Sequence, residues 1–213
     1  TNLPGGSVAI TLFANPHSFN SRKVHWALEE LGLPYAYTNV DIPKGAHKAP
    51  DFLAMNPNGR VPALQDGDLL MYESNAIMLY LAGEYGNGRL LPAASKARAL
   101  VYQWLSWQAS DFGPAIARPS TMKLLTMFGA PLDAAAYAAA GEAAKPVVAI
   151  LENHLKGRSL MTGDQLSIAD IAITETIGMM DMAGLPILST PNIGSYFKGM
   201  SQRPAFLKTR PAG

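Results

Sequence analysis

Polar side chains gather where the first predicted strand turns into the first predicted helix. Ser18, Asn20 and Ser21 follow an Asn15-Pro16 dipeptide that ends the strand. A hydroxyl at a helix N-terminus, aided by the helix dipole, could stabilise a thiolate bound there. Serine and asparagine are also ordinary N-cap residues, so capping of the helix by one of them is the alternative interpretation.

A second group of interest is a proline at the opening of a strand, in the run 60–64 (RVPAL). A proline cannot donate to the strand ladder, and its preceding peptide bond can be cis. A cis bond would leave the N–H and C=O of Val61 facing outward, where an extended peptide could pair with them. A trans Pro62 at a strand edge is the alternative.

A third group, Glu73 and Ser74, lies where a strand ends and a helix begins. The free N–H groups and partial positive charge of a helix N-terminus favour a carboxylate ligand. In that arrangement Ser74 and the helix end would hold the carboxylate, and Glu73 would face an ammonium group of the same ligand. The alternative is that the two residues cap their own helix.

The composition narrows the chemistry. The chain has no cysteine, which excludes a disulfide scaffold, cysteine-ligated zinc and a thiol nucleophile of its own, so any thiol must come from outside. With 17 Lys and Arg against 16 Asp and Glu, the net charge of +1 argues against nucleic acid or an anionic membrane as partner. No run of 18 apolar residues and no signal-peptide pattern at 1–7 appear, so no membrane span is expected.

Metal and nucleotide sites are not expected either. The histidines show no ligand spacing and have no carboxylate cluster beside them, and no G-x-G-x-x-G motif follows a strand.

Residues 7–85 alternate between strand and helix patterns. In the first helix Val24, Ala27, Leu28 and Leu31 recur at the i, i+3, i+4, i+7 spacing of an amphipathic helix. Strands are expected at 7–14, 35–42, 61–65 and 69–72, and helices around 24–31, 51–55 and 73–85. The order β-α-β-α-β-β-α predicts a small mixed sheet with helices packed on it, in the α+β class.

After a Gly- and Pro-rich linker, only helical patterns follow. Helices are expected at 93–112, interrupted by Gly113-Pro114, then at 116–127 and through the alanine-rich run to 155. Ser167 and Asp170 have the spacing of a capping box at the start of a further helix. The last stretch is predicted to hold short helices punctuated by Pro186, Pro191 and Pro204.

Taken together, these motifs resemble one family. The runs NPNGRVPAL at 56–64, DGD at 66–68, YESNAIMLYLA at 72–82, SIAD at 167–170 and QRP at 202–204 are similar, in order and spacing, to the cytosolic glutathione transferases. Within that family the chain looks most like bacterial phi-like or nu-like enzymes of the serine type. The resemblance implies a tail at 1–7, a thioredoxin-like glutathione-binding domain at 8–86, a linker at 87–92 and an all-helical domain at 93–213.

The resemblance also implies how glutathione would be held. Val61, ahead of a cis Pro62, would pair with the cysteinyl backbone, and Glu73 and Ser74 would hold the γ-glutamyl end. The glycyl carboxylate or the cysteinyl segment would be approached by three basic residues: His47, Lys48 and Arg60. From the residues alone, a basic pair in a loop is ordinarily just solvated.

For the catalytic residue the resemblance leaves two candidates. Ser18 matches the phi-type catalytic serine, whereas Asn20 matches an asparagine of a bacterial subgroup with disulfide-reductase activity. The first strand carries Phe13 where other classes carry a tyrosine.

The expected activity is glutathione transfer to a hydrophobic electrophilic small molecule, with glutathione as co-substrate. Alternatives are a glutathione-dependent disulfide or peroxide reductase on the same site, and a non-catalytic glutathione-binding module. A cytoplasmic homodimer is expected from the family. From position alone, the second-substrate pocket between the domains is expected to be lined by Phe19, Phe112, Ile116 and Met122.

Overall fold

The computed structural model describes residues 10–185 and 190–211. The predicted tail at 1–7, the first residues of the strand predicted at 7–14, and Pro186 lie outside these ranges. The chain divides into two compact units. The first comprises the chain up to Leu90 together with the segment from Pro204 onward, and the second is Leu91–Arg203.

The first unit is built on a four-stranded sheet with the strand order β2-β1-β3-β4. Its strands are β1 (Ile10–Ala14), β2 (Ala36–Asn39), β3 (Ala63–Asp66) and β4 (Leu69–Tyr72). β1 pairs in parallel with β2 and antiparallel with β3, and β3 pairs antiparallel with β4. The mixed sheet and the β-α-β-α-β-β-α order confirm the predicted α+β fold.

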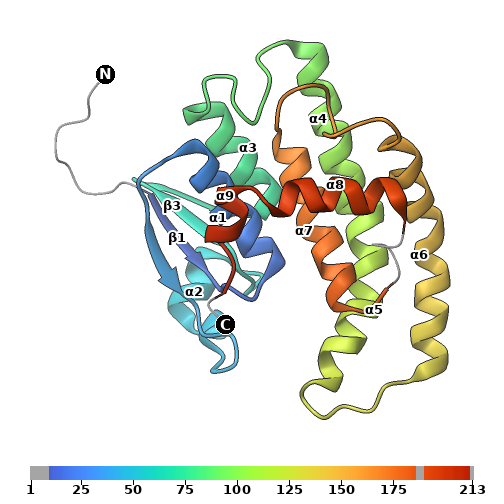
Figure 1. Ribbon diagram of the computed structural model, residues 1–213. Helices are drawn as coiled ribbons and strands as arrows, with labels where there is room; N and C mark the ends of the chain where they lie inside the picture. The colour runs from blue at the N-terminus through green and yellow to red at the C-terminus, as the bar shows by residue number, and fades with distance from the viewer. Residues whose placement is uncertain (1–9, 186–189, 212–213) are drawn as a thin grey trace. The chain divides into compact units, whose positions relative to one another are not determined.

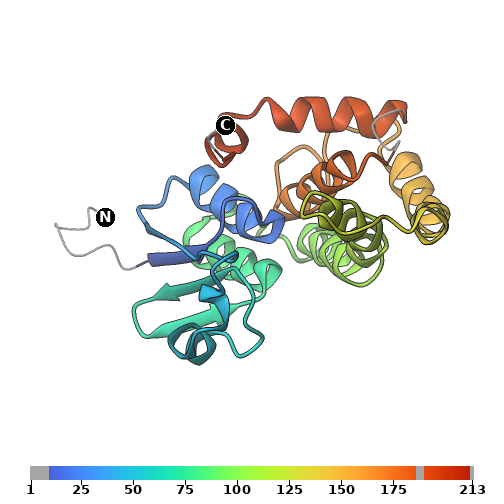
Figure 2. The same ribbon diagram turned by 90° about the horizontal axis from the view of Figure 1, so that it is seen from below.

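Helices cover both faces of this sheet (Figures 1 and 2). α1 (Phe19–Leu31) and α3 (Ser74–Tyr85) pack against each other on one face. On the other face α2 (Pro50–Met55), which follows the short 3₁₀ helix η1 (Ala46–Lys48), buries Phe52 against Val40 and Ala63. This is the thioredoxin-like arrangement that the resemblance implied.

The predicted apolar stripe of α1 is confirmed. Its four members, Val24, Ala27, Leu28 and Leu31, are all buried. The helix ends at Gly32, whose φ of 64° is the left-handed conformation that glycine adopts without a steric cost.

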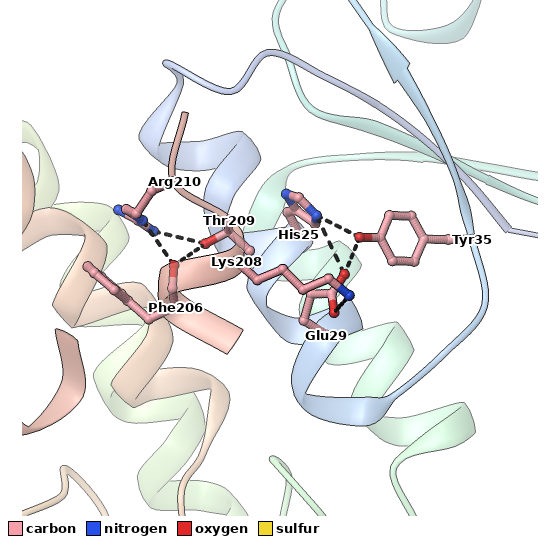
Figure 3. A network of polar contacts seen from close by, with 7 residues as sticks. All are labelled: His25, Glu29, Tyr35, Phe206, Lys208, Thr209 and Arg210. Atoms are coloured by element: carbon pink, nitrogen blue, oxygen red, sulfur yellow. Dashed lines mark hydrogen bonds and ion pairs between the residues drawn. The ribbon is translucent and has the colours of Figure 1, made fainter. Parts of the chain in front are cut away.

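The short helix α9 (Pro204–Lys208) belongs to the first unit because it packs on α1. Phe206 is buried edge-on against Trp26, with ring centroids 5.0 Å apart. Figure 3 shows Lys208 reaching Glu29, with Nζ 2.6 Å from Oε2. The observed division therefore differs from the predicted one, in which all of 93–213 belonged to the helical domain.

A polar network surrounds this contact on α1 (Figure 3). The hydroxyl of Tyr35 donates a short hydrogen bond to Oε1 of Glu29, and its oxygen lies 2.6 Å from Nε2 of His25. Burial opposes ionisation of Glu29, but the hydrogen bonds from Lys208 and Tyr35 outweigh it and lower the pKa of that carboxyl. Burial also raises the pKa of Tyr35 and lowers that of His25.

The second unit contains only helices among its described residues. They are α4 (Ser95–Trp107), α5 (Gly113–Thr126), α6 (Ala134–His154), α7 (Ile168–Met182) and α8 (Pro191–Ser201). α7 packs against α4, α5 and α8, and every residue from Ile168 to Ile177 is buried, so this helix forms the centre of the unit. The predicted all-helical character is confirmed.

Gly113-Pro114 was expected to interrupt the helix, but the structure shows no interruption there. α4 continues through a π-helical segment, η2 (Gln108–Phe112), directly into α5. Pro114 stands in the first turn of α5, directly after this π-helical segment. The π-helical segment thus connects α4 to α5 without a loop.

The predicted capping box at the start of α7 is confirmed. The N–H of Ser167 donates to Oδ2 of Asp170 at 2.9 Å. Asp170 is fully buried and also accepts from the Met161 N–H at 2.7 Å and the Tyr196 hydroxyl at 3.1 Å. The carboxylate therefore joins three segments of the second unit.

By length and composition alone, α6 is apolar enough to cross a membrane, with a mean hydropathy of 1.2. Eight of the eleven residues from Ala134 to Ala144 are alanine, and four aliphatic residues follow them in the helix: Val147, Val148, Ile150 and Leu151. The helix packs against α5 and α8 of its own unit. We therefore treat α6 as an alanine-rich helix of the bundle.

Candidate functional site

Ser18 is the N-cap residue of α1. Its Oγ accepts a hydrogen bond from the backbone N–H of Ser21 at 3.3 Å, so the capping interpretation is correct. Acting as an acceptor does not use the hydroxyl proton, and among the described residues no acceptor receives it. Ser18 can therefore cap α1 and still donate a hydrogen bond to a bound group.

Asn20 lies exposed in the first turn of α1. Its Oδ1 is 3.4 Å from the Oγ of Ser74, which is the first residue of α3. This long-range contact brings two of the three predicted groups together. The N-termini of α1 and α3 meet at one place in the first unit.

Glu73 precedes α3 in an unusual backbone conformation. Its φ of 73° lies in the left-handed region, where residues other than glycine and asparagine are uncommon. No side chain caps α3, so the capping alternative for Glu73 and Ser74 does not hold. The Glu73 side chain is exposed, and it stands beside a helix N-terminus, an arrangement that favours an anionic ligand.

The Val61–Pro62 peptide bond is cis. Pro62 is buried directly before β3, and Val61 is half-buried. Within the described residues, neither the N–H nor the C=O of Val61 has a hydrogen-bond partner. Both groups are available for pairing with an extended peptide.

The three basic candidates lie on two adjoining loops. Lys48 Nζ donates to the carbonyl oxygens of Asn58 and Gly59, at 3.4 and 3.0 Å, so it clamps η1 to the turn before Arg60. Arg60 is exposed. Nδ1 of His47 is buried without a hydrogen-bond partner in the described chain. The clamp made by Lys48 had no counterpart in the sequence analysis.

Asn56 shapes the same turn. Its Nδ2 donates to the carbonyl of Arg60 at 2.6 Å, and its Oδ1 accepts from the N–H of Asn58 at 3.1 Å. The dense turn chemistry at 56–59 thus holds the segment that leads to Val61.

The four residues expected to line a second-substrate pocket belong to different units. Phe19 is half-buried in the first unit, with the guanidinium of Arg22 3.9 Å from its ring centroid. In the second unit Phe112 is fully buried and stacked on Trp107, Ile116 is fully buried, and Met122 is half-buried. Their role in substrate binding stays a prediction.

The sequence analysis assigned no role to two buried residues beside Ser18. Asn15 is 7% exposed and makes hydrogen bonds through its backbone and both ends of its carboxamide. Arg22, also 7% exposed, donates to the carbonyl of Pro16 at 3.3 Å. The only signal was the Asn-Pro dipeptide, which marks a turn but not the partners of its side chains.

No group of three or more metal-ligating side chains occurs among residues 10–185 and 190–211.

Comparison with known proteins gives this geometry its context. The model "Glutathione S-transferase, N-terminal domain" matches residues 8–83, and "Glutathione S-transferase, C-terminal domain" matches residues 116–204. Glutathione S-transferase 3 of Zea mays is 35% identical over 208 residues, covering 94% of this chain and 92% of that protein. The chain belongs to the glutathione S-transferase family. The resemblance inferred from the motifs is thereby confirmed.

Other members of the glutathione S-transferase family are also similar to this chain over most of its length. Glutathione S-transferase GstB of Escherichia coli K12 is 36% identical over 201 residues, covering 93% of this chain and 96% of that protein. The crystal structure of a family member from Pseudomonas fluorescens, with two glutathione bound, has a TM-score of 0.86. It is 28% identical and covers 97% of this chain and 94% of that one.

Proposed function

We propose that this family member binds glutathione in its first unit and stabilises the thiolate for attack on hydrophobic electrophilic small molecules. The observation that carries the proposal is the contact between Asn20 and Ser74, which joins the N-termini of α1 and α3. A ligand held at α3 by its γ-glutamyl carboxylate would then lie beside the Ser18 hydroxyl. The solved relative with two glutathione bound supports the choice of ligand.

The glutathione backbone would use three recognition elements. Ser74 and the N-terminus of α3 would hold the γ-glutamyl carboxylate, with the exposed Glu73 facing its ammonium group. The unpaired N–H and C=O of Val61, beside Pro62, would pair with the cysteinyl residue, as in strand addition.

At the other end of the tripeptide, the glycyl carboxylate would be near His47, Lys48 and Arg60. Nδ1 of His47 is buried and has no hydrogen-bond partner in the described chain. A ligand here would either hydrogen-bond this nitrogen or bind Nε2, the other nitrogen of the ring. Lys48 would act partly through the clamp that holds the adjoining turn.

The thiolate would form at the N-terminus of α1. A free thiol with a pKa near 8.5 is only a few per cent ionised at pH 7. Lowering that pKa by about two units requires roughly 2.7 kcal/mol. One hydrogen bond from Ser18 to the charged sulfur, worth about 1.5–3 kcal/mol, would supply much of this. The thiolate would then attack an electrophilic carbon of the second substrate, so that a C–S bond forms and the leaving group departs with the electron pair of its bond to that carbon.

A second candidate function is glutathione-dependent reduction of disulfides or peroxides. It would depend on Asn20, because this exposed carboxamide lies in the same helical turn as Ser18 and matches the asparagine of the bacterial subgroup with disulfide-reductase activity. A non-catalytic glutathione-binding module is the third possibility, and it would bind without turnover. For each of these functions we infer a cytoplasmic homodimer with no metal or nucleotide cofactor.

The test is paired measurement of glutathione affinity and of turnover, with a panel of aryl halides and with 2-hydroxyethyl disulfide. Wild type is compared with Ser18→Ala and Asn20→Ala, and with Ser159→Ala and Asn153→Ala as matched changes at exposed positions of the second unit. Aryl turnover that collapses only in Ser18→Ala supports the transferase. Disulfide turnover that depends on Asn20 favours the reductase, and absence of glutathione binding refutes the site.

A further inference from the structure

The turn that presents Ser18 is held by one buried asparagine. Asn15 follows β1, and its backbone carbonyl accepts from the N–H of Ser18 at 3.0 Å. Its Oδ1 accepts from the N–H of His17 at 3.0 Å. The main chain and the side chain of one residue therefore close the same turn.

The other end of the carboxamide anchors this turn to the sheet. Nδ2 of Asn15 donates to the carbonyl of Val40 at 3.0 Å, across 25 positions of the chain. Val40, in turn, follows β2 and donates its N–H to the carbonyl of Ala14 at 2.8 Å. Because the contact is buried, no water replaces the bond without entering the core.

A hydroxyl links Asn15 to Ser18 from the helix side. The backbone N–H of Asn15 donates to Oγ of Ser21 at 3.2 Å, and the N–H of Ser21 donates to Oγ of Ser18 at 3.3 Å. Ser21 is 1% exposed, so its side chain is fixed by packing. The Ser18 oxygen thus accepts from the backbone N–H of Ser21, whose side chain is hydrogen-bonded to the backbone of Asn15.

We propose that Asn15 is a positioning residue, which sets the direction of the Ser18 hydroxyl toward the glutathione sulfur by locking the turn from Asn15 to Ser18. It does not touch the ligand and acts only through Ser18. This inference rests on the proposed function, because it assumes that Ser18 stabilises a bound thiolate. Misplacement of a catalytic group by about 1 Å can lower a rate by about 100-fold, so a modest change in this turn has a measurable effect.

Two substitutions separate the contacts of the carboxamide. Asn15→Asp keeps an acceptor for the His17 N–H but replaces the donor to the Val40 carbonyl with a second oxygen. Asn15→Ala removes both contacts. Ser21→Ala is a third, smaller change, which leaves the carboxamide in place and removes the acceptor of the Asn15 N–H. Asn153→Ala, at an exposed position of the second unit, is the matched control.

The readouts are the pKa of bound glutathione, from the ultraviolet absorbance of its thiolate, and the pH profile of kcat/KM. Circular dichroism and glutathione affinity are measured on the same samples, so that unfolding or loss of the γ-glutamyl contacts is recognised. We expect Asn15→Ala to lower kcat/KM by about 10- to 100-fold and to raise the thiol pKa, with a smaller effect for Asn15→Asp. Affinity for glutathione should stay within about threefold, because Ser74 and Val61 are unchanged.

A double-mutant cycle decides whether Asn15 acts through Ser18. In the Ser18→Ala background, Asn15→Ala should change kcat/KM by less than about twofold, since the group it positions is gone. Equal effects in the two backgrounds would overturn the proposal, as would an unchanged thiol pKa in folded Asn15→Ala, Asn15→Asp and Ser21→Ala proteins. If Ser18→Ala itself leaves the thiol pKa unchanged, the catalytic role proposed for Ser18 is wrong and this inference falls with it.

Discussion

Lys48 and Gly59 are joined by a hydrogen bond between Nζ and the glycine carbonyl oxygen, at 3.0 Å. Gly59 is buried and has a φ of +55°, and a Cβ added to it would lie 2.7 Å from that Nζ and 2.9 Å from the carbonyl oxygen of His47. The lysine end could move away, but the backbone oxygen could do so only by shifting η1. Two of the three basic residues proposed to meet glutathione, His47 and Lys48, are therefore placed by the absence of a side chain at Gly59.

Gly59→Ala should accordingly destabilise the fold and weaken glutathione binding. Gly67→Ala is the matched control, because Gly67 has a φ of +58° but nothing within 4 Å of an added Cβ. The left-handed conformation alone costs about 1–2 kcal/mol for a residue with a Cβ, and we expect Gly59→Ala to lose at least about 1 kcal/mol more. Urea unfolding and titration with glutathione measure the two effects. Equal losses in both variants would show that the contacts at Gly59 are unimportant.

Phe206 should be needed for the stability of the first unit. Its ring is 8% exposed and lies between Trp26 and the guanidinium of Arg210, which is 3.8 Å from the ring centroid. Phe206→Ala should lower the free energy of unfolding by about 3 kcal/mol, as for other buried phenylalanines. The neighbouring Leu207 is 59% exposed, and Leu207→Ala should change it by less than about 0.5 kcal/mol. Similar losses in the two variants would contradict the packing described here.

The two acceptor oxygens of Asp170 should be needed for the stability of the second unit. In Asp170→Asn, an NH₂ group would face either the Met161 N–H or the Ser167 N–H, both of which are donors. One buried donor would then lack an acceptor, and we expect a loss of at least about 2 kcal/mol in denaturant unfolding. Asp164→Asn makes the same change at an exposed position and should be close to neutral. A stable Asp170→Asn protein would argue against the network.

Stability should decrease as the pH falls below neutrality, because of two half-buried histidines, His25 and His154. Burial lowers the pKa of His25 below 6.5, Glu29 opposes the shift, and Lys208 and Arg210 add to it. Burial also lowers the pKa of His154. The unfolded chain then binds protons before the folded chain does, so the free energy of unfolding drops as the pH falls through about 6.5.

Urea unfolding at pH 8 and pH 5.5 measures this difference. It should shrink in His25→Gln and in His154→Gln, because each removes one of the groups that titrate differently in the two states. Leu207→Ala, a change at an exposed position that removes no titratable group, should leave the pH dependence unchanged. A wild-type protein that is equally stable at both pH values would refute the prediction.

Local patterns predicted most of the fold. The stripe from Val24 to Leu31, the hairpin around Gly67 and the Ser167–Asp170 box each depend on neighbours along the chain, and the structure confirms them. The π turn before Gly113 was not predictable in this way. Both α4 and α5 pack on α7, and residue spacing alone does not describe such contacts between helices.

In the candidate site, too, local features could be predicted from the sequence and contacts between distant residues could not. The sequence indicated Ser18 and the pair Glu73-Ser74 as candidates, because each lies where a predicted strand ends and a predicted helix begins. The contact between Asn20 and Ser74, and that between Asn15 and Val40, join positions far apart in sequence. Such pairs follow from the strand order of the sheet, so they became visible only when β1, β2 and α3 were placed in space.

The return of α9 to α1 has a consequence for how the protein is made. The first unit includes the segment from Pro204 onward, so the surface of α1 around Trp26 stays uncovered until that segment leaves the ribosome. A domain that is contiguous in sequence can fold before the chain beyond it is made, whereas this one also needs a segment that follows the whole second unit. A nascent chain stalled before Pro204 should therefore carry an unfinished first unit, even though all of its strands have already been translated.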